Sequence, residues 1–323
     1  MSASPLPLLP ISSSSTIAAC AALELLDDDV FICSYPKSGT TWSQNIVHKL
    51  ISNGERNVPH ISLSAPFFEI DAHWNDEEGA LDAAVVEGHR VANRGRRVFN
   101  THLLWSMLPR AAASGARYIY VVRSGVDVAF SFFKHLSSQV EGGWDCATQG
   151  GWDAFFTAWM RGEIAYGKWS AHVGEWMAAA EAHPGRILVV RFEDLVADLA
   201  AEVRRIAAFI GAAQSDARID AMCATHFTFA AMKADAAQFQ PRSVGWRDDA
   251  ATGRPFEFLR RGAVGDGAKN MSPEQRALFV ASLAVDLALP AAAGAGDAFP
   301  PWAGLGAEHG RPTGAVETRY VSR

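Results

Sequence analysis

An apolar run that leads directly into a turn of small residues constrains the fold of this chain more than any other feature. Residues 30–35 (VFICSY) follow three aspartates and predict a buried strand. Residues 36–40 (PKSGT) are typical of a turn, and residues 41–50 predict a helix. A strand joined to a helix by a short turn is half of a βαβ unit, so this feature predicts a parallel sheet.

The same alternation of strand and helix continues along the chain. Further strands are predicted at residues 97–100, 117–122 and 187–191, and helices at residues 126–136, 152–160, 168–182 and 195–210. Loops are expected at residues 141–152 and 234–254. The fold class that this pattern predicts is α/β, with a central, mainly parallel sheet flanked by helices.

Composition divides the 323 residues into one domain with two extensions. Residues 1–27 are rich in Ser, Pro and Ala and are expected at the periphery. Residues 28–289 carry the predicted strands and helices, a length that suits a single large domain. Residues 290–323 are rich in Ala, Gly and Pro, which indicates a low-complexity tail with little packed structure.

The charge balance argues against nucleic acid or an anionic membrane as a partner. The formal net charge is −6, so a site for a polyanion has to be built locally from a few basic residues. No apolar run is long enough to span a bilayer and no Lys or Arg precedes Lys37, so a cytoplasmic protein is expected. The cysteines are scattered and lack metal spacing, which predicts buried or partly buried free thiols and no metal site at Cys20, Cys33, Cys146 and Cys223.

The turn at residues 35–42 (YPKSGTTW) carries the strongest chemical signal. Small residues between a strand and a helix direct backbone N–H groups and the helix dipole at an anion. Lys37 adds a positive charge, the Ser and Thr hydroxyls add hydrogen-bond donors, and Trp42 offers a surface for stacking. The turn is P-loop-like without being a Walker A loop, in which Lys follows the second Gly, because here Lys37 precedes Gly39.

This turn resembles the 5′-phosphosulfate-binding motif of the cytosolic sulfotransferases, which use 3′-phosphoadenosine-5′-phosphosulfate (PAPS) and release 3′-phosphoadenosine-5′-phosphate (PAP). Other short segments match that family in order between residues 30 and 270, among them VVR at residues 121–123, THL at residues 101–103 and FLRRG at residues 258–262. The nucleotide-binding residues that the resemblance implies are Lys37, Ser38, Gly39, Thr40, Thr41, Trp42, Arg123, Ser131, Thr228, Phe229, Arg260, Arg261 and Gly262.

The resemblance also implies a reaction, the in-line transfer of a sulfuryl group from PAPS to a hydroxyl or amine of a small molecule without a metal. His102 is the implied base, because an imidazole near neutral pKa can take a proton from an attacking hydroxyl. Lys37 is implied to stabilise the leaving phosphate, and Ser131 to exchange contacts with that lysine. The acceptor pocket implied by PFFE at residues 66–69 and by nearby aromatic residues includes Phe67, Trp105, Phe132 and Tyr166.

Departures from the family pattern leave two alternatives open. Asn100 stands where the family commonly has Lys, and Phe192 stands where it commonly has Tyr, which would suit a PAPS- or PAP-binding protein with little turnover. Residues 187–194 (ILVVRFED) would suit the acidic strand of a small-molecule P-loop kinase, although its Walker A order is missing. The family's dimer signature is not recognisable around residues 269–274, so the oligomeric state stays open.

Overall fold

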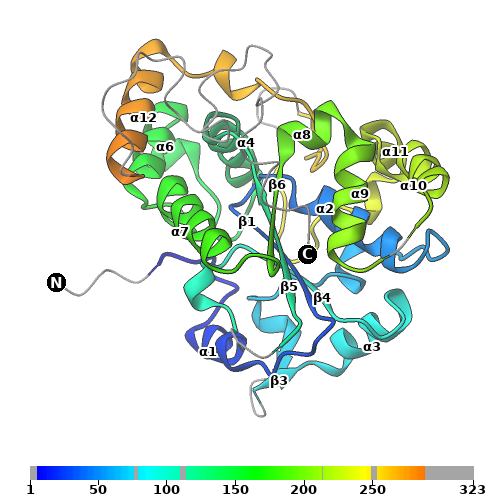
Figure 1. The fold of residues 1–323 in the computed structure, drawn as a ribbon. Coiled ribbons are helices and arrows are strands. Elements are labelled where there is room, and N and C mark those ends of the chain that lie inside the picture. The colour runs from blue at the N-terminus through cyan, green and yellow to red at the C-terminus, as the bar shows by residue number, and fades with distance from the viewer. Residues whose placement is uncertain (1–5, 76–78, 110–113, 213, 249–252, 288–323) are drawn as a thin grey trace.

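A four-stranded parallel sheet lies at the centre of the computed structural model, which describes residues 6–75, 79–109, 114–212, 214–248 and 253–287 (Figure 1). Its strands run in the spatial order β4-β1-β5-β6, and every pairing between neighbours is parallel. The predicted α/β class with a mainly parallel sheet is therefore confirmed. The strands are β1 (Val30–Ser34), β4 (Val98–Thr101), β5 (Arg117–Val122) and β6 (Ile187–Arg191).

Both faces of the sheet are buried, because side chains that alternate along each strand enter two different cores. Phe31 and Tyr118 belong to the core on one face, whereas Ile32 and Ile119 belong to the core on the other. In Figure 1 the two helical layers lie on either side of the sheet. The first layer contains α4 (Gly125–Ser138), α6 (Trp152–Arg161), α7 (Trp169–Ala182) and α12 (Pro273–Asp286), and the second contains α2 (Thr40–Ile51), α9 (Leu199–Phe209) and α10 (Asp216–Met222).

One predicted helix is wrong in its extent, because residues 195–210 do not form a single helix. The chain forms α8 (Phe192–Ala197), breaks at Asp198, and continues as α9. Asp198 has a φ of −146°, and its side chain accepts a hydrogen bond from Ala201 N at 3.1 Å. An aspartate that satisfies a free N–H at a helix start stabilises a new helix there, which the apolar periodicity alone did not reveal. The predicted loop at residues 141–152 likewise contains a short helix, α5 (Cys146–Gln149).

The N-terminal segment packs against the rest of the molecule. It contains α1 (Ser14–Ala22), where Cys20 is buried. Pro7 O accepts a hydrogen bond from Tyr166 N at 2.7 Å, and Ile11 O accepts one from Asp71 N at 2.9 Å. The predicted domain boundaries stay predictions, and residues 290–323 lie outside the described part of the chain.

The remaining elements are mostly short and connect the sheet with its two helical layers. They are the hairpin of β2 (Trp74–Asn75) and β3 (Ala80–Leu81), α3 (Ala83–Ala92), α11 (Phe229–Ala234), and short helical turns at Ile61–Leu63, Asp71–His73, Trp105–Met107, Cys223–Phe227, Ala236–Gln238 and Gly267–Lys269. Residues 239–248 and 253–266, called here the wall segment, carry little regular structure, and Trp246 forms an isolated bridge to Gln139 at the end of α4.

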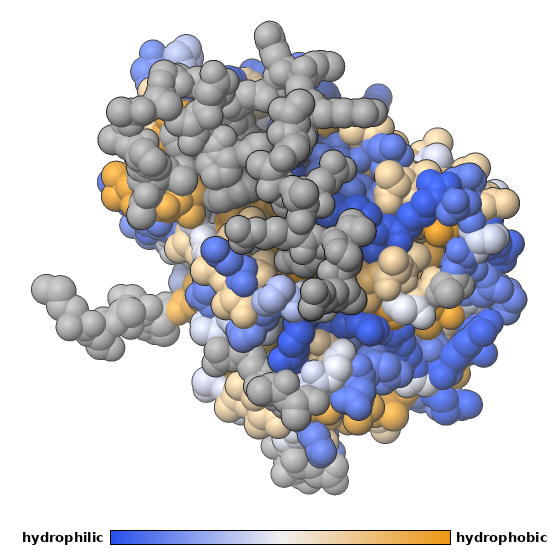
Figure 2. Space-filling model, viewed as in Figure 1, coloured by the Kyte–Doolittle hydropathy of each residue, from blue (hydrophilic) through white to orange (hydrophobic). Residues whose placement is uncertain are grey.

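On the face shown in Figure 2, hydrophobic residues gather over α12, where Leu278 and Val285 are exposed. All four cysteines are free thiols; three are buried as expected, whereas Cys146 is exposed because α5 lies at the surface. Within the described ranges, no helix combines the length and the apolar character needed to cross a membrane.

Candidate active site

The candidate site lies at the carboxyl edge of the sheet, where four parallel strands end side by side. Parallel strands bring the residues that follow them to one edge, which is where α/β proteins commonly bind ligands. Here the turn of Lys37 follows β1, His102 follows β4, Arg123 follows β5 and Phe192 follows β6. These residues line one cavity of about 510 Å³, so the sheet topology gathers side chains that are far apart in the sequence.

The backbone of the turn after β1 requires unusual conformations. Gly39 has a φ of 108°, and a Cβ at this position would lie 2.8 Å from Phe192 Cδ2, so both conformation and space favour glycine. Lys37 has a φ of 69°, which is uncommon for a residue with a side chain and occurs most often at functional turns. Ser34 Oγ and Thr40 Oγ1 lie 2.6 Å apart and tie the end of β1 to the start of α2.

Lys37 lies in a crowded and positively charged environment. Its Nζ is 3.2 Å from His135 Nδ1 and 4.3 Å from the centre of the Phe258 ring. Burial, together with the positive charges of Arg123 and Arg260, lowers the pKa of Lys37 to about 7. Such a lysine gains most from a ligand that brings negative charge into the cavity.

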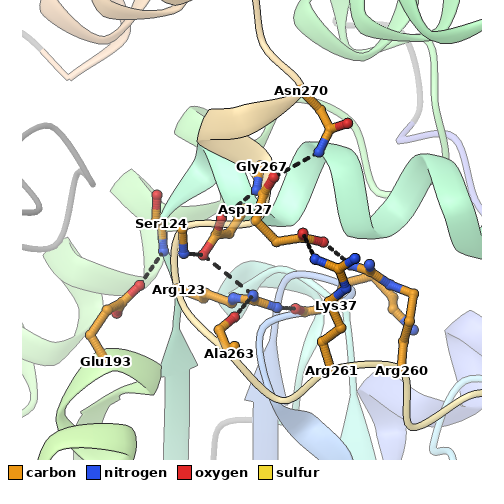
Figure 3. Close-up of polar contacts among 12 residues, drawn as sticks. Lys37, Arg123, Ser124, Asp127, Glu193, Arg260, Arg261, Ala263, Gly267 and Asn270 are labelled. Atoms are coloured by element: carbon orange, nitrogen blue, oxygen red, sulfur yellow. Dashed lines mark hydrogen bonds and ion pairs between the residues drawn. The ribbon is translucent and has the colours of Figure 1, made fainter.

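Arg123 connects the Lys37 turn to the wall segment, as the close-up in Figure 3 shows. Its guanidinium donates to Lys37 O at 3.2 Å and to Ala263 O at 3.0 Å, and it lies 4.3 Å from the centre of the Phe192 ring. The carboxylate of Asp127, one turn further along α4, accepts from it at 3.4 Å.

Two carboxylates hold the end of the wall segment against α4 (Figure 3). Asp127 accepts hydrogen bonds from Gly265 N at 2.8 Å and from Gly267 N at 2.7 Å. Asp266 is buried and accepts from Arg260 at 2.5 Å and from Arg261 at 2.7 Å. Asp127 therefore contacts Arg123, and Asp266 contacts the other two arginines.

Several polar atoms in this region fit a phosphorylated ligand. Ser38 Oγ and Arg123 Nε are buried, and no described residue hydrogen-bonds to either atom. A buried donor without a partner is costly, and phosphate oxygens are the acceptors that guanidinium and hydroxyl groups bind well. The described residues hold no group of three or more His, Cys, Asp or Glu side chains that could bind a metal ion.

His102 is held as a neutral imidazole with one defined tautomer. Its Nδ1 lies 2.8 Å from Ser34 O, and because a carbonyl only accepts, Nδ1 carries the proton and Nε2 keeps its lone pair. Burial, together with the charge of Lys37, lowers the pKa of His102 to about 4. Glu69 Oε1 accepts from His102 N at 2.7 Å, and His172 Nε2 donates to His102 O at 3.0 Å, so the backbone is fixed on both sides.

The aromatic rings predicted for an acceptor pocket are brought together in part. Phe67, Phe132 and Tyr166 line the cavity beside His102, with ring centres of Phe67 and Tyr166 each 5.2 Å from the imidazole. The structure does not bring Trp105 to the cavity. Its ring packs against Tyr118 and Trp176 in the core behind the sheet, because residue 105 lies three positions beyond the site in a helical turn that faces inward.

Most of the predicted nucleotide-binding residues also line the cavity. Lys37 and Arg123 are joined there by Gly39, Thr40, Thr41, Trp42, Ser131, Phe229, Arg260, Arg261 and Gly262. Ser38 is buried within the turn instead. Thr228 lies outside the lining and caps α11, where its Oγ1 accepts from Ala231 N at 3.2 Å. Gly262 packs under Phe229, since a Cβ there would lie 2.3 Å from that ring.

The comparisons with known proteins identify the family. A family model described as a sulfotransferase domain matches residues 27–283. The chain belongs to the sulfotransferase family. The expectation drawn from the turn at residues 35–42 is thereby confirmed, and the Walker A order that a P-loop kinase requires is absent from that turn.

Individual relatives of this sulfotransferase share a little under a third of its sequence. Sulfotransferase 1A1 of Canis lupus familiaris is 29% identical over 265 residues, which cover 80% of this chain and 82% of that protein. The amine sulfotransferase of Oryctolagus cuniculus is 29% identical over 265 residues, or 79% of each chain. The crystal structure of mouse sulfotransferase SULT7A1 complexed with PAP has the same fold, with a TM-score of 0.65 at 23% identity, covering 86% of this chain and 90% of that chain.

Some residues that line the candidate site were not predicted from the sequence. His135 and Phe258 contact Lys37, and Leu9 and Ile11 line the cavity from the N-terminal segment. A polar residue at position 135 inside an apolar helix was the available signal for His135. Nothing local in the sequence marks Leu9 or Ile11, because their place depends on hydrogen bonds to residues far along the chain.

Proposed function

We propose that this sulfotransferase transfers a sulfuryl group from PAPS to a hydroxyl of a small-molecule acceptor. The observation that carries the proposal is the meeting of three features in one cavity. They are the Lys37 turn, the arginines at positions 123 and 260, and a neutral imidazole at His102 with a free Nε2. The first two suit a ligand with separated anionic groups, and the third suits proton removal from an acceptor.

Two anion sites are proposed for the nucleotide. The turn around Lys37 and the start of α2 would bind the 5′-phosphosulfate, with Ser38, Gly39, Thr40 and Thr41 as donors from side chain or backbone. Arg123, Arg260 and Arg261 would bind the 3′-phosphate together with Ser131 and the backbone at Gly262. Trp42 and Phe229 line the same cavity and offer aromatic faces for the adenine, and Thr228 stays a proposed contact only through its place before Phe229.

The reaction proposed is an in-line displacement at sulfur. A bond forms between the acceptor oxygen and sulfur, the bond between sulfur and the phosphate oxygen breaks, and the acceptor's proton moves to His102 Nε2. Lys37 stabilises the negative charge that develops on the leaving phosphate, and Ser131 is the proposed partner of that lysine during the exchange. The hydrogen bond from His102 Nδ1 to Ser34 O stabilises the imidazolium that results.

The acceptor is proposed to be a largely apolar small molecule. Phe67, Phe132 and Tyr166 line the cavity beside the base, and Leu9 and Ile11 extend this apolar lining. Pockets lined in this way suit flat or hydrophobic alcohols and phenols. One relative is named an amine sulfotransferase, so an amine stays an alternative acceptor. The metal-free reaction, the cytoplasmic location and the absence of nucleic-acid and membrane partners stay predictions.

A PAP-binding protein with little turnover is the second candidate function. The observation that favours it is Asn100, whose amide Nδ2 is engaged with Ala65 O at 2.7 Å and brings no charge to the cavity. Its side chain is buried beside the proposed sulfuryl position. Both candidates bind the nucleotide, so they differ in turnover alone.

The experiment combines nucleotide binding with turnover. We expect calorimetry to show tight binding of PAP and much weaker binding of 5′-AMP, because AMP leaves Arg123 and Arg260 without a ligand. A panel of alcohols, phenols and amines with labelled PAPS should then give sulfated product in EDTA. His102→Ala should lower turnover about 10²–10⁴-fold while PAP affinity stays within a few-fold, since the base contacts the acceptor.

Each alternative has its own result in this experiment. Equal affinity for PAP and AMP would contradict the two-site nucleotide proposal. Tight PAP binding without product from any acceptor would favour the binding protein. Magnesium-dependent release of phosphate from ATP would favour the kinase.

A further inference from the structure

His135 lines the cavity, and the proposed reaction assigns it no role. It lies on α4, one helical turn after Ser131, and its ring faces three aromatic residues of the wall segment. The centres of the Trp246, Phe256 and Phe258 rings lie 5.0, 5.9 and 5.9 Å from the imidazole centre, in edge-to-face arrangements. A phenylalanine at position 135 could pack against these three rings. Packing alone therefore does not explain why this residue is a histidine.

The contact between His135 and Lys37 supplies that explanation. Nδ1 of His135 lies 3.2 Å from Nζ of Lys37, and in the part of the chain that the structure describes no other acceptor hydrogen-bonds to this Nζ. The protonated form of Lys37 has only donors, so with this form Nδ1 accepts and the imidazole proton lies on Nε2. Lys37 therefore donates a hydrogen bond from Nζ to Nδ1 of His135.

The position of the ammonium depends on two contacts from different elements. His135 on α4 accepts one N–H, and the face of Phe258 in the wall segment lies 4.3 Å from Nζ. A lysine side chain has a flexible stem of four carbons and loses much conformational freedom when its ammonium is held in one place. Two fixed contacts keep the charge at the mouth of the turn, where the leaving phosphate is proposed to lie.

We infer that His135 is a positioning residue for Lys37, which holds the lysine ammonium against the proposed phosphosulfate turn through the Nδ1 contact. The inference rests on the proposed function, since it assigns a task within the same site. The charged and titratable groups that face Lys37 are Arg123 from the end of β5, Arg260 from the wall segment, His102 after β4 and His135 on α4. Among them His135 is the group that accepts a hydrogen bond from Nζ.

The acceptor bond has a measurable consequence for the protonation of Lys37. A hydrogen bond that stabilises the charged ammonium raises its pKa, so removing the bond should lower the pKa below its present value of about 7. PAP binds the protonated lysine, and its affinity should therefore fall tenfold for each pH unit above the pKa of the free protein. The pH at which this fall begins, called here the onset, therefore reports the hydrogen bond between Lys37 and His135.

The experiment compares two substitutions at position 135 by calorimetry with PAP from pH 5.5 to 9. In His135→Phe, which keeps an aromatic ring against Trp246, the onset should move down by about one pH unit and kcat should fall about tenfold. His135→Asn can place an amide oxygen near the Nδ1 position and should restore the onset toward that of the native protein. Lys37→Met should remove the onset altogether, which assigns it to that lysine.

A matched control separates this effect from a general loss of a buried imidazole. His89 is buried outside the cavity and donates through Nε2 to Val98 O, so His89→Phe should leave the onset unchanged. Nitrogen NMR of the native protein adds a test that needs no folded variant: at pH 5.5, where Lys37 is protonated, His135 should be the Nε2–H tautomer in the ligand-free state. The opposite tautomer, or an unchanged onset in a His135→Phe protein that still binds PAP, would overturn the inference. If the native protein does not bind PAP, this result would instead overturn the proposed function on which the inference rests.

Discussion

The neighbours of Asn100 fix the place from which its side chain reaches the cavity. It follows Phe99 in β4 and its side chain is buried at the edge of the cavity, two residues before His102. Its backbone is fixed as well, because Asn100 N donates to Pro66 O at 3.0 Å and Asn100 O accepts from Phe68 N at 2.8 Å. The side chain therefore reaches the site from a rigid position, and a longer basic residue there would bring its charge close to Lys37.

We expect Asn100→Lys to raise turnover on a simple phenol about tenfold, or ~1.4 kcal/mol of barrier. An added ammonium would stabilise the oxygens that gain charge during transfer, and charge-assisted hydrogen bonds are about twice as strong as neutral ones. PAP affinity should change little. Steady-state kinetics with labelled PAPS measures the gain.

Asn100→Ala is the matched control for this change. It also removes the hydrogen bond to Ala65 O, so both variants should lose about 1–3 kcal/mol of stability, while only the lysine variant gains turnover. Unchanged or lower turnover in Asn100→Lys would show that another group, such as the Lys37 and His135 pair, already fills the role.

The residues of the site were predictable from the sequence where the chemistry is local. Lys37, Gly39 and Trp42 lie within one turn, whose composition and place after a strand indicate the proposed anion site. His135 was not predictable in this way, because its contact with Lys37 joins residues 98 positions apart and depends on the side chains of α4 and the wall segment. Trp105 was predicted at the site but lies in the core. An aromatic residue that is close in the sequence to a candidate catalytic residue can equally belong to the core.

Among the elements, the N-terminal segment reaches the site although it lies far from the other lining residues in the sequence. Asp71 accepts hydrogen bonds from Ser13 N and from Thr16 Oγ1, both at 2.7 Å, and so fixes the start of α1. The preceding residues continue along the cavity and place Leu9 and Ile11 in its lining. Composition alone placed these residues at the periphery, because long-range hydrogen bonds leave no periodic pattern in the sequence.

Asp71→Ala should weaken acceptor binding without weakening nucleotide binding. Release of the segment would remove part of the apolar lining, which at about 0.8 kcal/mol per buried CH₂ amounts to ~1–2 kcal/mol, a five- to thirtyfold higher acceptor KM. The dissociation constant of PAP should stay within twofold of the native value. Asp82→Ala removes a comparable helix-capping carboxylate from α3 and should leave both constants unchanged; equal effects of the two substitutions would contradict the assignment.

The elements themselves were predicted well where periodicity is strong. The apolar runs of β1, β5 and β6 reveal buried strands because both faces of a parallel sheet are covered. The break between α8 and α9 was missed although its signal was present, since Asp198 is a typical helix-capping residue. The wall segment has no periodicity, and its path over the cavity follows from contacts such as the bridge between Gln139 and Trp246.

At the scale of the whole molecule, Asp127 joins three parts that are distant in sequence. Its carboxylate links Arg123 at the end of β5, its own helix α4, and the backbone of Gly265 and Gly267. A single buried carboxylate thus connects the sheet edge with the end of the wall segment.

Asp127→Asn should weaken PAP binding about tenfold. The amide offers one acceptor oxygen in place of two, so one glycine N–H loses its partner, and bonds to a charged group are worth about 1.5–3 kcal/mol each. Calorimetry measures the affinity, and hydrogen exchange at residues 263–267 should become faster. Asp286→Asn, at the end of α12 where the carboxylate contacts Ser170 and Lys168, is the control and should alter neither quantity. Native-like PAP affinity in Asp127→Asn would mean that the wall segment is held by its apolar contacts instead.

The strand order also has a consequence for how the chain is made. β1 is an interior strand, yet its two neighbours, β4 and β5, are separated from it by roughly 65 and 85 residues, and β6 follows only at Ile187. A ribosome that adds about 5–20 residues per second takes several seconds to pass from β1 to β5 and several more to reach β6. Until β4 follows at Val98, the apolar strand at residues 30–34 has neither of the strands that flank it in the folded sheet. The emerging chain must therefore shield Phe31 and Ile32 by temporary collapse or by a chaperone, and synonymous codon changes between residues 35 and 117 should alter the yield of folded protein more than the same changes after residue 191.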